Sequence, residues 1–189
     1  MDSLDDVSNG ELVNNNCNSN DSGIFLHNST SNIVANNTCN NNNWGGISLG
    51  GDDSNTVVNN TCNNNSGGIK LDGSDHNIVD NNICNNNGFS GINLYSSDSN
   101  TVSDNTCNNN RIGIYLYRSY SNTVTNNTFL DNTEYDIVEE SYAGELAHRE
   151  YVAGQFVWFL AGFGMILVVS VVMVARIRRM ETHENQMPP

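Results

Sequence analysis

The chain has 189 residues, which is enough for one domain and a tail. Its formal net charge is -14, and the part before Gln155 carries four basic residues (Lys70, Arg111, Arg118 and Arg149) against nineteen acidic ones. Such a surface repels phosphate backbones, so we expect no nucleic-acid partner, whereas cations, cationic proteins and neutral sugars are compatible with it.

A repeat of 22 or 23 residues begins near residue 10 and keeps its phase to about residue 138. The unit reads approximately N-x-V-x-x-N-x-C-x-x-N-(three or four)-G-I-x-L. The recurring positions of the unit keep the same spacing through five successive units, which a compositional bias toward asparagine would not produce. The cysteines of successive units are Cys17, Cys39, Cys62, Cys84 and Cys107, and Phe129 takes the next place.

The apolar residues of each unit alternate, as in Ile24 and Leu26 or Ile47 and Leu49. A period of two predicts β-strands, and asparagine and glycine both disfavour helix interiors. A unit of this length suits three short strands joined by bends, with each coil stacked on the last at about 4.8 Å. The sequence therefore predicts an all-β, right-handed, single-stranded parallel β-helix of about five to six coils, over residues 1–138.

Stacking places like residues on like. One predicted ladder of asparagines, at a bend, consists of Asn37, Asn60, Asn82, Asn105 and Asn127. The amides of such a ladder can hydrogen-bond from coil to coil, and asparagine tolerates the backbone angles that bends need. The five cysteines form a second structural ladder, which we interpret as interior packing because Phe129 replaces the sixth. Vertical disulfides and metal ligation are the alternatives.

An acidic column precedes the repeat asparagine by two residues and consists of Asp53, Asp75 and Asp98. Stacked carboxylates about 5 Å apart either bind a cation or point apart into water. Calcium prefers such oxygen clusters, so Ca²⁺ is the one cofactor that the sequence suggests. A solvated turn is the alternative, since aspartate is common in turns.

Aromatic residues gather on later coils. Tyr95 and Tyr117 are equivalent positions one coil apart, Tyr115 and Tyr120 flank them, and Trp44 and Phe89 share another column. Exposed stacked rings suit the flat faces of sugars, whereas ordinary tyrosines on a strand face are the alternative. The four tyrosines are the predicted carbohydrate-binding residues.

The units SNTVVNNTCNNNSGGIKL and SNTVSDNTCNNNRIGIYL resemble parallel β-helix repeats of carbohydrate-binding and sugar-hydrolase proteins and of NosD-type periplasmic copper-binding proteins. The resemblance implies the fold. Relatives with this repeat include lyases, uronate epimerases and copper-delivery proteins, so it does not fix an activity. The histidines are scattered and no cysteine pair is closely spaced, so we expect no copper-delivery role.

The C-terminal part differs in character. Residues 139–155 are predicted to be a juxtamembrane connector, partly helical. Residues 156–175 are twenty residues without a charge, which matches one transmembrane helix. Arg176, Arg178 and Arg179 follow, so the positive-inside rule predicts a cytoplasmic tail over 176–189 and a β-helix outside the cell membrane.

The first unit is degenerate, so either it is the cap of the β-helix or the chain is part of a longer protein. No signal peptide is apparent, which favours a truncated N-terminus, with a tail-anchored cytosolic protein as the alternative.

These patterns together predict a single-pass, cell-surface β-helix that binds a polysaccharide or a surface protein and is not itself an enzyme. One alternative is a polysaccharide lyase or epimerase, or a fragment of one, with Arg118 beside the acidic column as the base. Uniform short bends, however, offer a shallow groove with no catalytic residue that we can name. The other alternative is a structural stalk or adhesion element.

Overall fold

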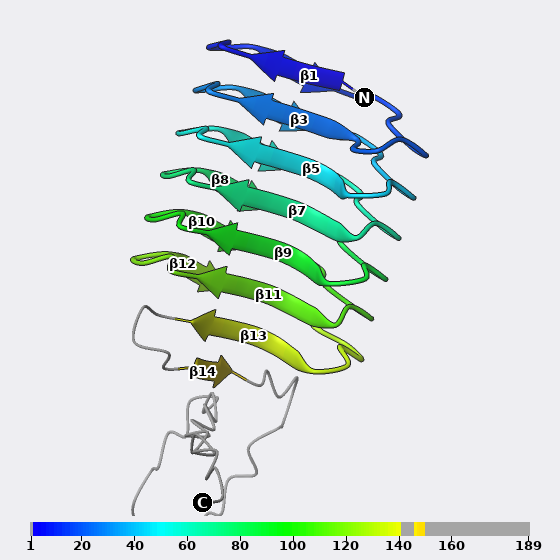
Figure 1. Ribbon diagram of the computed structural model, residues 1–189, viewed down its shortest axis with the longest axis vertical. Helices are drawn as coiled ribbons and strands as arrows, with labels where there is room; N and C mark the ends of the chain where they lie inside the picture. Colours follow the sequence, from blue (N-terminus) through cyan, green and yellow to red (C-terminus); the bar gives the residue numbers. More distant parts are fainter. Residues whose placement is uncertain (1, 141–145, 150–189) are drawn as a thin grey trace, which may run out of the picture.

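The computed structural model describes residues 2–140 and 146–149 and shows a right-handed parallel β-helix (Figure 1). Among the described residues, seven parallel strands stack in one sheet, and an eighth, antiparallel strand follows them; we call this the long sheet. Its strands are β1 (Asp2–Asp5), β3 (Ile24–His27), β5 (Gly45–Gly50), β7 (Gly67–Asp72), β9 (Ser90–Tyr95), β11 (Ile112–Tyr117), β13 (Tyr135–Glu140) and β14 (Leu146–Arg149). The chain makes six turns from β1 to β13, which confirms the predicted number of coils.

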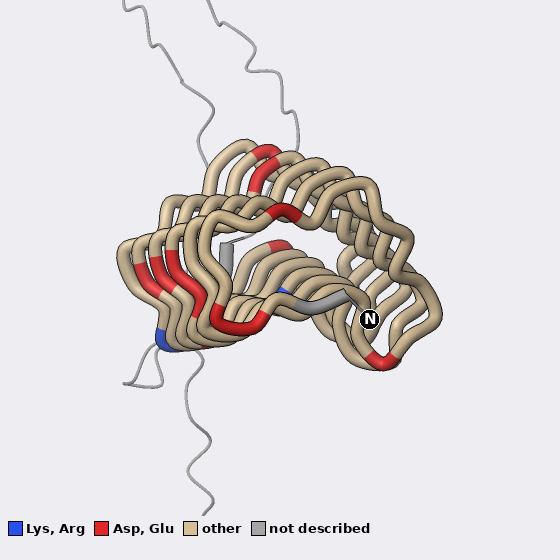
Figure 2. The backbone as a smooth tube through the Cα atoms, turned by 90° about the horizontal axis from the view of Figure 1, so that it is seen from above, with Lys and Arg blue, Asp and Glu red and all other residues tan. Residues whose placement is uncertain are grey.

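Two further faces complete each coil. The short sheet consists of β2 (Glu11–Val13), β4 (Ile33–Ala35), β6 (Thr56–Val58), β8 (Ile78–Asp80), β10 (Thr101–Ser103) and β12 (Thr123–Thr125). The third face is a column of single parallel bridges, through Asn16, Thr38, Thr61, Ile83, Thr106 and Thr128. Viewed along the axis of the β-helix, the coils lie one above another, with acidic residues at several corners and few basic residues (Figure 2).

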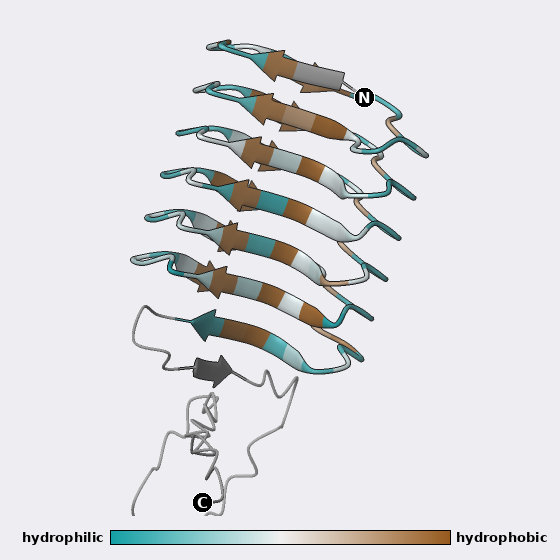
Figure 3. Cartoon of the chain, in the orientation of Figure 1, coloured by the Kyte–Doolittle hydropathy of each residue, from teal (hydrophilic) through white to brown (hydrophobic). Residues whose placement is uncertain are grey.

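The interior is made of the columns that the repeat predicts. Along each strand of the long sheet the isoleucine and leucine of G-I-x-L are buried and the residue between them faces outward, so hydropathy alternates along the arrows (Figure 3). The valines of the short sheet and the cysteines after the next bend close the core. Because each coil repeats the same contacts, one apolar core extends along the whole stack.

Asparagine ladders lie at three of the bends. In each, the side-chain oxygen accepts the backbone N–H of the ladder asparagine one coil earlier, as Asn60 Oδ1 accepts from Asn37 at 2.9 Å. The side-chain amide donates to a carbonyl of that earlier coil, as Asn60 Nδ2 donates to Val34 at 2.9 Å. The predicted ladder is thus confirmed, and two more run beside it, through Asn32, Asn55, Asn77, Asn100 and Asn122 and through Asn42, Asn65, Asn87, Asn110 and Asn132.

The residue before each ladder asparagine has a left-handed backbone. Asn36 and Asn41, for example, both have φ of 57°. Asparagine and serine fill most of these places, and they tolerate this region better than branched or bulky residues. The asparagine-rich composition therefore has two structural causes: one asparagine turns the chain, and the next hydrogen-bonds between coils.

Glycine opens each G-I-x-L unit because two coils meet there. A Cβ at Gly46 would lie 2.8 Å from the Cβ of Cys62 and 2.8 Å from the carbonyl oxygen of Gly68. Equivalent glycines meet the same partners in the neighbouring coils. The glycine and cysteine columns are therefore one packing device, which agrees with the interpretation of the cysteines as interior residues.

Each end of the β-helix carries a strand pairing that the repeat does not reveal. At the N-terminus, β1 pairs with β3 from Asp2 onward, so the stacking begins before the point where the repeat can be read. At the C-terminus, β13 runs to Glu140 and β14 pairs antiparallel with it, where a partly helical connector was expected over 139–155. Strand pairing is favoured there because the last coil leaves an open edge.

No helix among the described residues is long and apolar enough to cross a membrane. The predicted transmembrane segment, 156–175, and tail, 176–189, lie outside the described residues.

Candidate functional site

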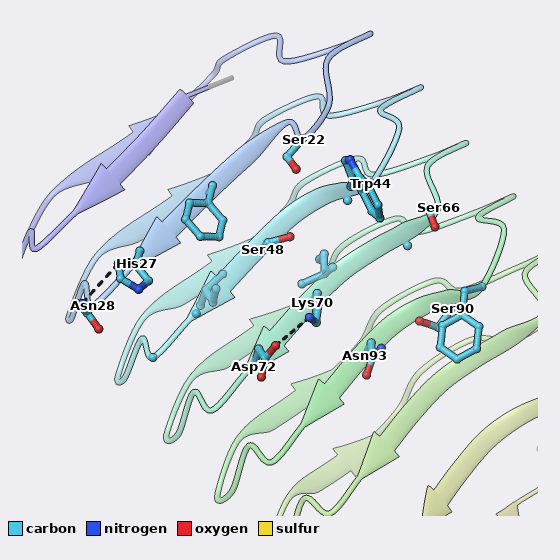
Figure 4. Close-up of a pocket in the computed structure, with 18 residues that line it drawn as sticks. Ser22, His27, Asn28, Trp44, Ser48, Ser66, Lys70, Asp72, Ser90 and Asn93 are labelled. Atoms are coloured by element: carbon cyan, nitrogen blue, oxygen red, sulfur yellow. Dashed lines mark hydrogen bonds and ion pairs between the residues drawn. The ribbon is translucent and has the colours of Figure 1, made fainter.

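An open groove with a volume of about 600 Å³ runs across the outer face of the long sheet (Figure 4). It crosses β3, β5, β7 and β9 and the bends that precede them. Its floor is formed by the outward residue of each G-I-x-L unit: Phe25, Ser48, Lys70 and Asn93. These positions vary from coil to coil while the flanking isoleucine and leucine do not, because the flanking residues are fixed by the core.

The rim of the groove is partly aromatic. Trp44 and Phe89 lie at its side in the same column, because Gly67 N–H donates to the Trp44 carbonyl at 3.0 Å and Phe89 N–H to the Ser66 carbonyl at 2.7 Å. The predicted sharing of a column by Trp44 and Phe89 is therefore confirmed, with Ser66 between them. At the other side, His27 and Asp72 lie in the equivalent end positions of β3 and β7.

Three of the four predicted sugar-binding tyrosines form one cluster next to this groove. The rings of Tyr95 and Tyr117 stack with centroids 5.0 Å apart, and Tyr115 lies 6.3 Å from Tyr117. Phe89 meets Tyr115 edge to face at 5.6 Å. Phe89 lines the groove as well, so the groove and the tyrosine cluster form one continuous surface.

Tyr115 is also tied to the last coil, where its hydroxyl donates to Glu140 Oε2 at 2.7 Å. Burial, the hydrogen bond to Glu140 and the negative charge of that carboxylate all raise the pKa of Tyr115. The hydroxyl therefore stays protonated and bonded to Glu140, and the ring is held in place as part of the cluster.

Tyr120 does not belong to the cluster. It lies past the next bend, in the column of the acidic residues, where its backbone N–H donates to Asp98 Oδ1 at 2.7 Å. Arg118, expected beside that column, lies in the column of Gly73 and Ser96, at a left-handed corner with φ of 50°. Its guanidinium lies over the Tyr117 ring, 4.8 Å from the centroid, and so borders the aromatic cluster.

The acidic column does stack, through its backbone. Asp53 Oδ1 accepts the N–H of Asp75 at 2.7 Å, and Asp75 Oδ1 accepts the N–H of Asp98 at 2.6 Å. Each carboxylate thus has one oxygen engaged in holding the bend. No group of three or more His, Cys, Asp or Glu residues that could hold a metal ion is found in the described part of the chain. Calcium binding at this column remains a prediction.

A buried carboxylate that the sequence analysis missed lies one residue before this column. Asp52 is 0% exposed and stands in a ladder whose other members are Ser29, Ser74, Ser97 and Ser119. Its oxygens accept the N–H groups of Ser29 and Gly50, both at 2.5 Å. Burial nevertheless raises the pKa of the Asp52 carboxyl. The signal was present in the sequence as an aspartate in a serine column.

The five cysteines form no disulfide bonds and are buried in the core. Burial raises the pKa of the Cys62, Cys84 and Cys107 thiols well above the usual value. Metal binding requires thiolates, so this buried column does not favour metal ligation, the alternative interpretation of the cysteines.

The groove was not found from the sequence, apart from Trp44 and Phe89. Its floor residues share no residue type, so no column of like residues marks them. The available signal is positional: the x of each G-I-x-L unit faces outward on a strand, and side chains one coil apart lie about 5 Å from each other.

Comparison with solved structures agrees with this architecture. The periplasmic alginate epimerase AlgG is similar in three crystal structures: a single-substitution variant (27% identity, TM-score 0.64, 66% of this chain and 31% of that one), a double-substitution variant (26%, 0.60, 71% and 36%) and AlgG itself (26%, 0.55, 64% and 35%). The chain thus spans about a third of the length of these structures. No curated protein matches it.

A family model described as periplasmic copper-binding protein (NosD) matches residues 2–150, which include every coil of the β-helix. The match covers most of the chain and coincides with the repeat, the ladders and the stacked sheets described above. The chain therefore belongs to the NosD family of parallel β-helix proteins.

Proposed function

We propose that this protein binds carbohydrate chains along the outer face of its long sheet, without catalysing a reaction on them. The observation that carries the proposal is the continuous surface formed by the groove and the tyrosine cluster, which meet at Phe89. An open groove across several coils suits an extended chain better than a small molecule, which binds in enclosed pockets. Aromatic rings at its side and end offer flat apolar faces of the kind that sugars contact.

The proposal includes the position of the β-helix outside the cytoplasm, held by one C-terminal transmembrane helix at 156–175. The NosD family and the AlgG structures are both described as periplasmic, which supports the first part. The charge-free segment followed by arginines supports the second. A surface protein remains the alternative partner, and a stalk without a ligand the alternative role.

Epimerase activity is a second candidate, because the similar solved structures are of an alginate epimerase. Against it, the described groove contains one His, one Lys and one Asp among its lining residues, and all three are already paired. His27 Nδ1 lies 3.0 Å from Asp5 Oδ1, and Lys70 Nζ lies 2.8 Å from Asp72 Oδ2. Neither pair leaves a base and an acid facing each other across the groove.

A polysaccharide screen of the purified protein, with and without calcium, tests these candidates together. Retention on a polysaccharide without any change in chain length or sugar composition is the expected result. Replacing Tyr95 and Tyr117 together with alanine is expected to weaken retention, and Tyr120→Ala, outside the cluster, is the matched control. Shortened or epimerised chains would establish an enzyme. If the protein neither retains nor alters any polysaccharide, a structural stalk is the remaining role. Retention that depends on calcium, and that loses this dependence in Asp75→Asn, would support the cation site.

A further inference from the structure

The aromatic rim of the groove contains a gap one coil wide. Trp44 and Phe89 are two coils apart in one column, so their backbones are separated by about 9.6 Å, and Ser66 is the small residue between them. Stacking one flat ring between two others requires about 7–8 Å, from carbon contacts of 3.5–4.0 Å on each side. The gap therefore has the width of a single sugar ring. Trp44 is 70% exposed and free to turn toward it.

The floor of the gap is open because Gly67 has no side chain, and the packing of the coils does not require a glycine at this position. At Gly67 an added Cβ would meet nothing nearer than the Ser90 carbonyl oxygen at 3.9 Å, and the backbone there is not left-handed. Its neighbour Gly68 is different, because a Cβ there would overlap the Gly91 carbonyl oxygen and lie 2.9 Å from the Cβ of Cys84. The fold requires Gly68 but does not require Gly67, and the missing side chain at Gly67 leaves the groove open between Trp44 and Phe89.

Two polar atoms at this place lack a hydrogen-bond partner. Ser90 is 1% exposed and its Oγ is unpaired, and the buried Oδ1 of Asn93, three residues further along β9, is unpaired too. Both residues line the groove (Figure 4). A buried polar atom without a partner costs about 1–3 kcal/mol, so such atoms in a groove indicate a ligand that completes them. Asn93 Oδ1 needs a hydroxyl that donates to it, and the Ser90 hydroxyl can pair with either a donor or an acceptor. Adjacent hydroxyls of one sugar can supply both partners.

The charge of the groove favours a neutral ligand. The cation on its floor, Lys70, is already neutralised by Asp72 at 2.8 Å. The chain before Gln155 carries nineteen acidic residues against four basic ones, so a polyanion would be repelled on approach. A uronate polymer, the kind of ligand suggested by the similarity to an alginate epimerase, is therefore disfavoured here.

We infer that the gap between Trp44 and Phe89 is a subsite for one neutral pyranose residue of a glycan chain. The ring lies over Gly67 between the two aromatic side chains, and neighbouring hydroxyls bind Ser90 Oγ and Asn93 Oδ1. This inference rests on the proposed carbohydrate function and adds the ligand class and the subsite.

Ligand-detected NMR on the full-length protein in detergent micelles tests it, with hexasaccharide probes of equal length. The neutral probes are β-1,4-linked glucose and mannose and α-1,4-linked glucose, and the anionic probes are galacturonate and mannuronate oligomers. At least one neutral probe is expected to bind at least tenfold more tightly than either uronate. Gly67→Val, which fills the gap, is expected to lower that affinity at least tenfold. Ser90→Ala is expected to lower it about two- to tenfold, the worth of one hydrogen bond.

The control is Thr123→Val on β12, which makes a similar change on the exposed face of the short sheet and is expected to leave binding unchanged. Trp44→Ala is a second test of the gap that does not depend on packing at Gly67, because the Trp44 side chain is mostly solvent-exposed. Uronates binding as tightly as the neutral probes would overturn the ligand class. Neutral binding that survives both Gly67→Val and Trp44→Ala but is lost on replacing Tyr95 and Tyr117 would overturn the subsite and keep the carbohydrate function. Absence of binding to every probe would overturn both.

Discussion

The asparagine ladder predicts a large difference in stability between two chemically identical substitutions. Asn60→Ala leaves the buried backbone N–H of Asn37 without its acceptor, which costs about 1–3 kcal/mol. It also removes a hydrogen bond to the Val34 carbonyl, worth about 0.5–1.5 kcal/mol. We expect the free energy of unfolding to fall by about 2–4 kcal/mol, a large part of the 5–15 kcal/mol typical of a domain.

Asn108→Ala is the matched control, because Asn108 ends a stack on the third face and its Oδ1 has no partner. Its truncation removes a buried oxygen that has no partner, so stability is expected to stay the same or to rise by up to about 3 kcal/mol. Urea unfolding followed by circular dichroism measures both variants beside the unaltered protein. Equal losses, or a loss below about 1 kcal/mol in Asn60→Ala, would show that the ladder is not the main source of order at the bends.

Three further predictions each concern one column of stacked residues. Asp52→Ser restores the serine ladder, and because burial raises the folded-state pKa of Asp52 above its unfolded value, the carboxyl destabilises the fold once it ionises. The stability gained by the variant should therefore be near zero below about pH 4 and grow as the pH rises, so a pH-independent gain in parallel urea titrations would contradict this account. Gly46→Ala should cost about 1–3 kcal/mol through overlap with Cys62, whereas Gly67→Ala should be neutral or stabilise by up to about 1 kcal/mol, and equal thermal shifts would disprove the distinction. The five buried thiols should resist alkylation by iodoacetamide until the chain is unfolded, and mass spectrometry showing rapid native labelling would place them at the surface.

The parts of the fold predicted from the sequence are those that repeat. The glycine, cysteine and asparagine columns recur because each coil makes the same contacts with the next, so their spacing reveals the coil length and their chemistry reveals the interior. The tyrosine pair was found in the same way, since Tyr95 and Tyr117 are equivalent positions. Tyr120 and Arg118 were misplaced because the residues between Tyr117 and Asn122 form a bend, where side-chain direction depends on individual backbone angles.

The strand pairings at the two ends of the β-helix and the groove could not be predicted. The first coil has lost the consensus and is held by backbone pairing of β1 with β3, which leaves little trace in residue types. The groove depends on residues that differ from coil to coil, on a glycine that packing does not require, and on a serine and an asparagine left without partners.

By itself the sequence determined the coil length, the parallel stacking of the strands, the interior columns and the sign of the surface charge, because each of these repeats or sums along the chain. Only the tertiary structure decided which outward residues share a surface. In a β-helix, positions 22 or 23 residues apart become neighbours at about 5 Å, so the residues of the site come from different coils. The register between coils therefore has to be known before these residues can be identified as one site.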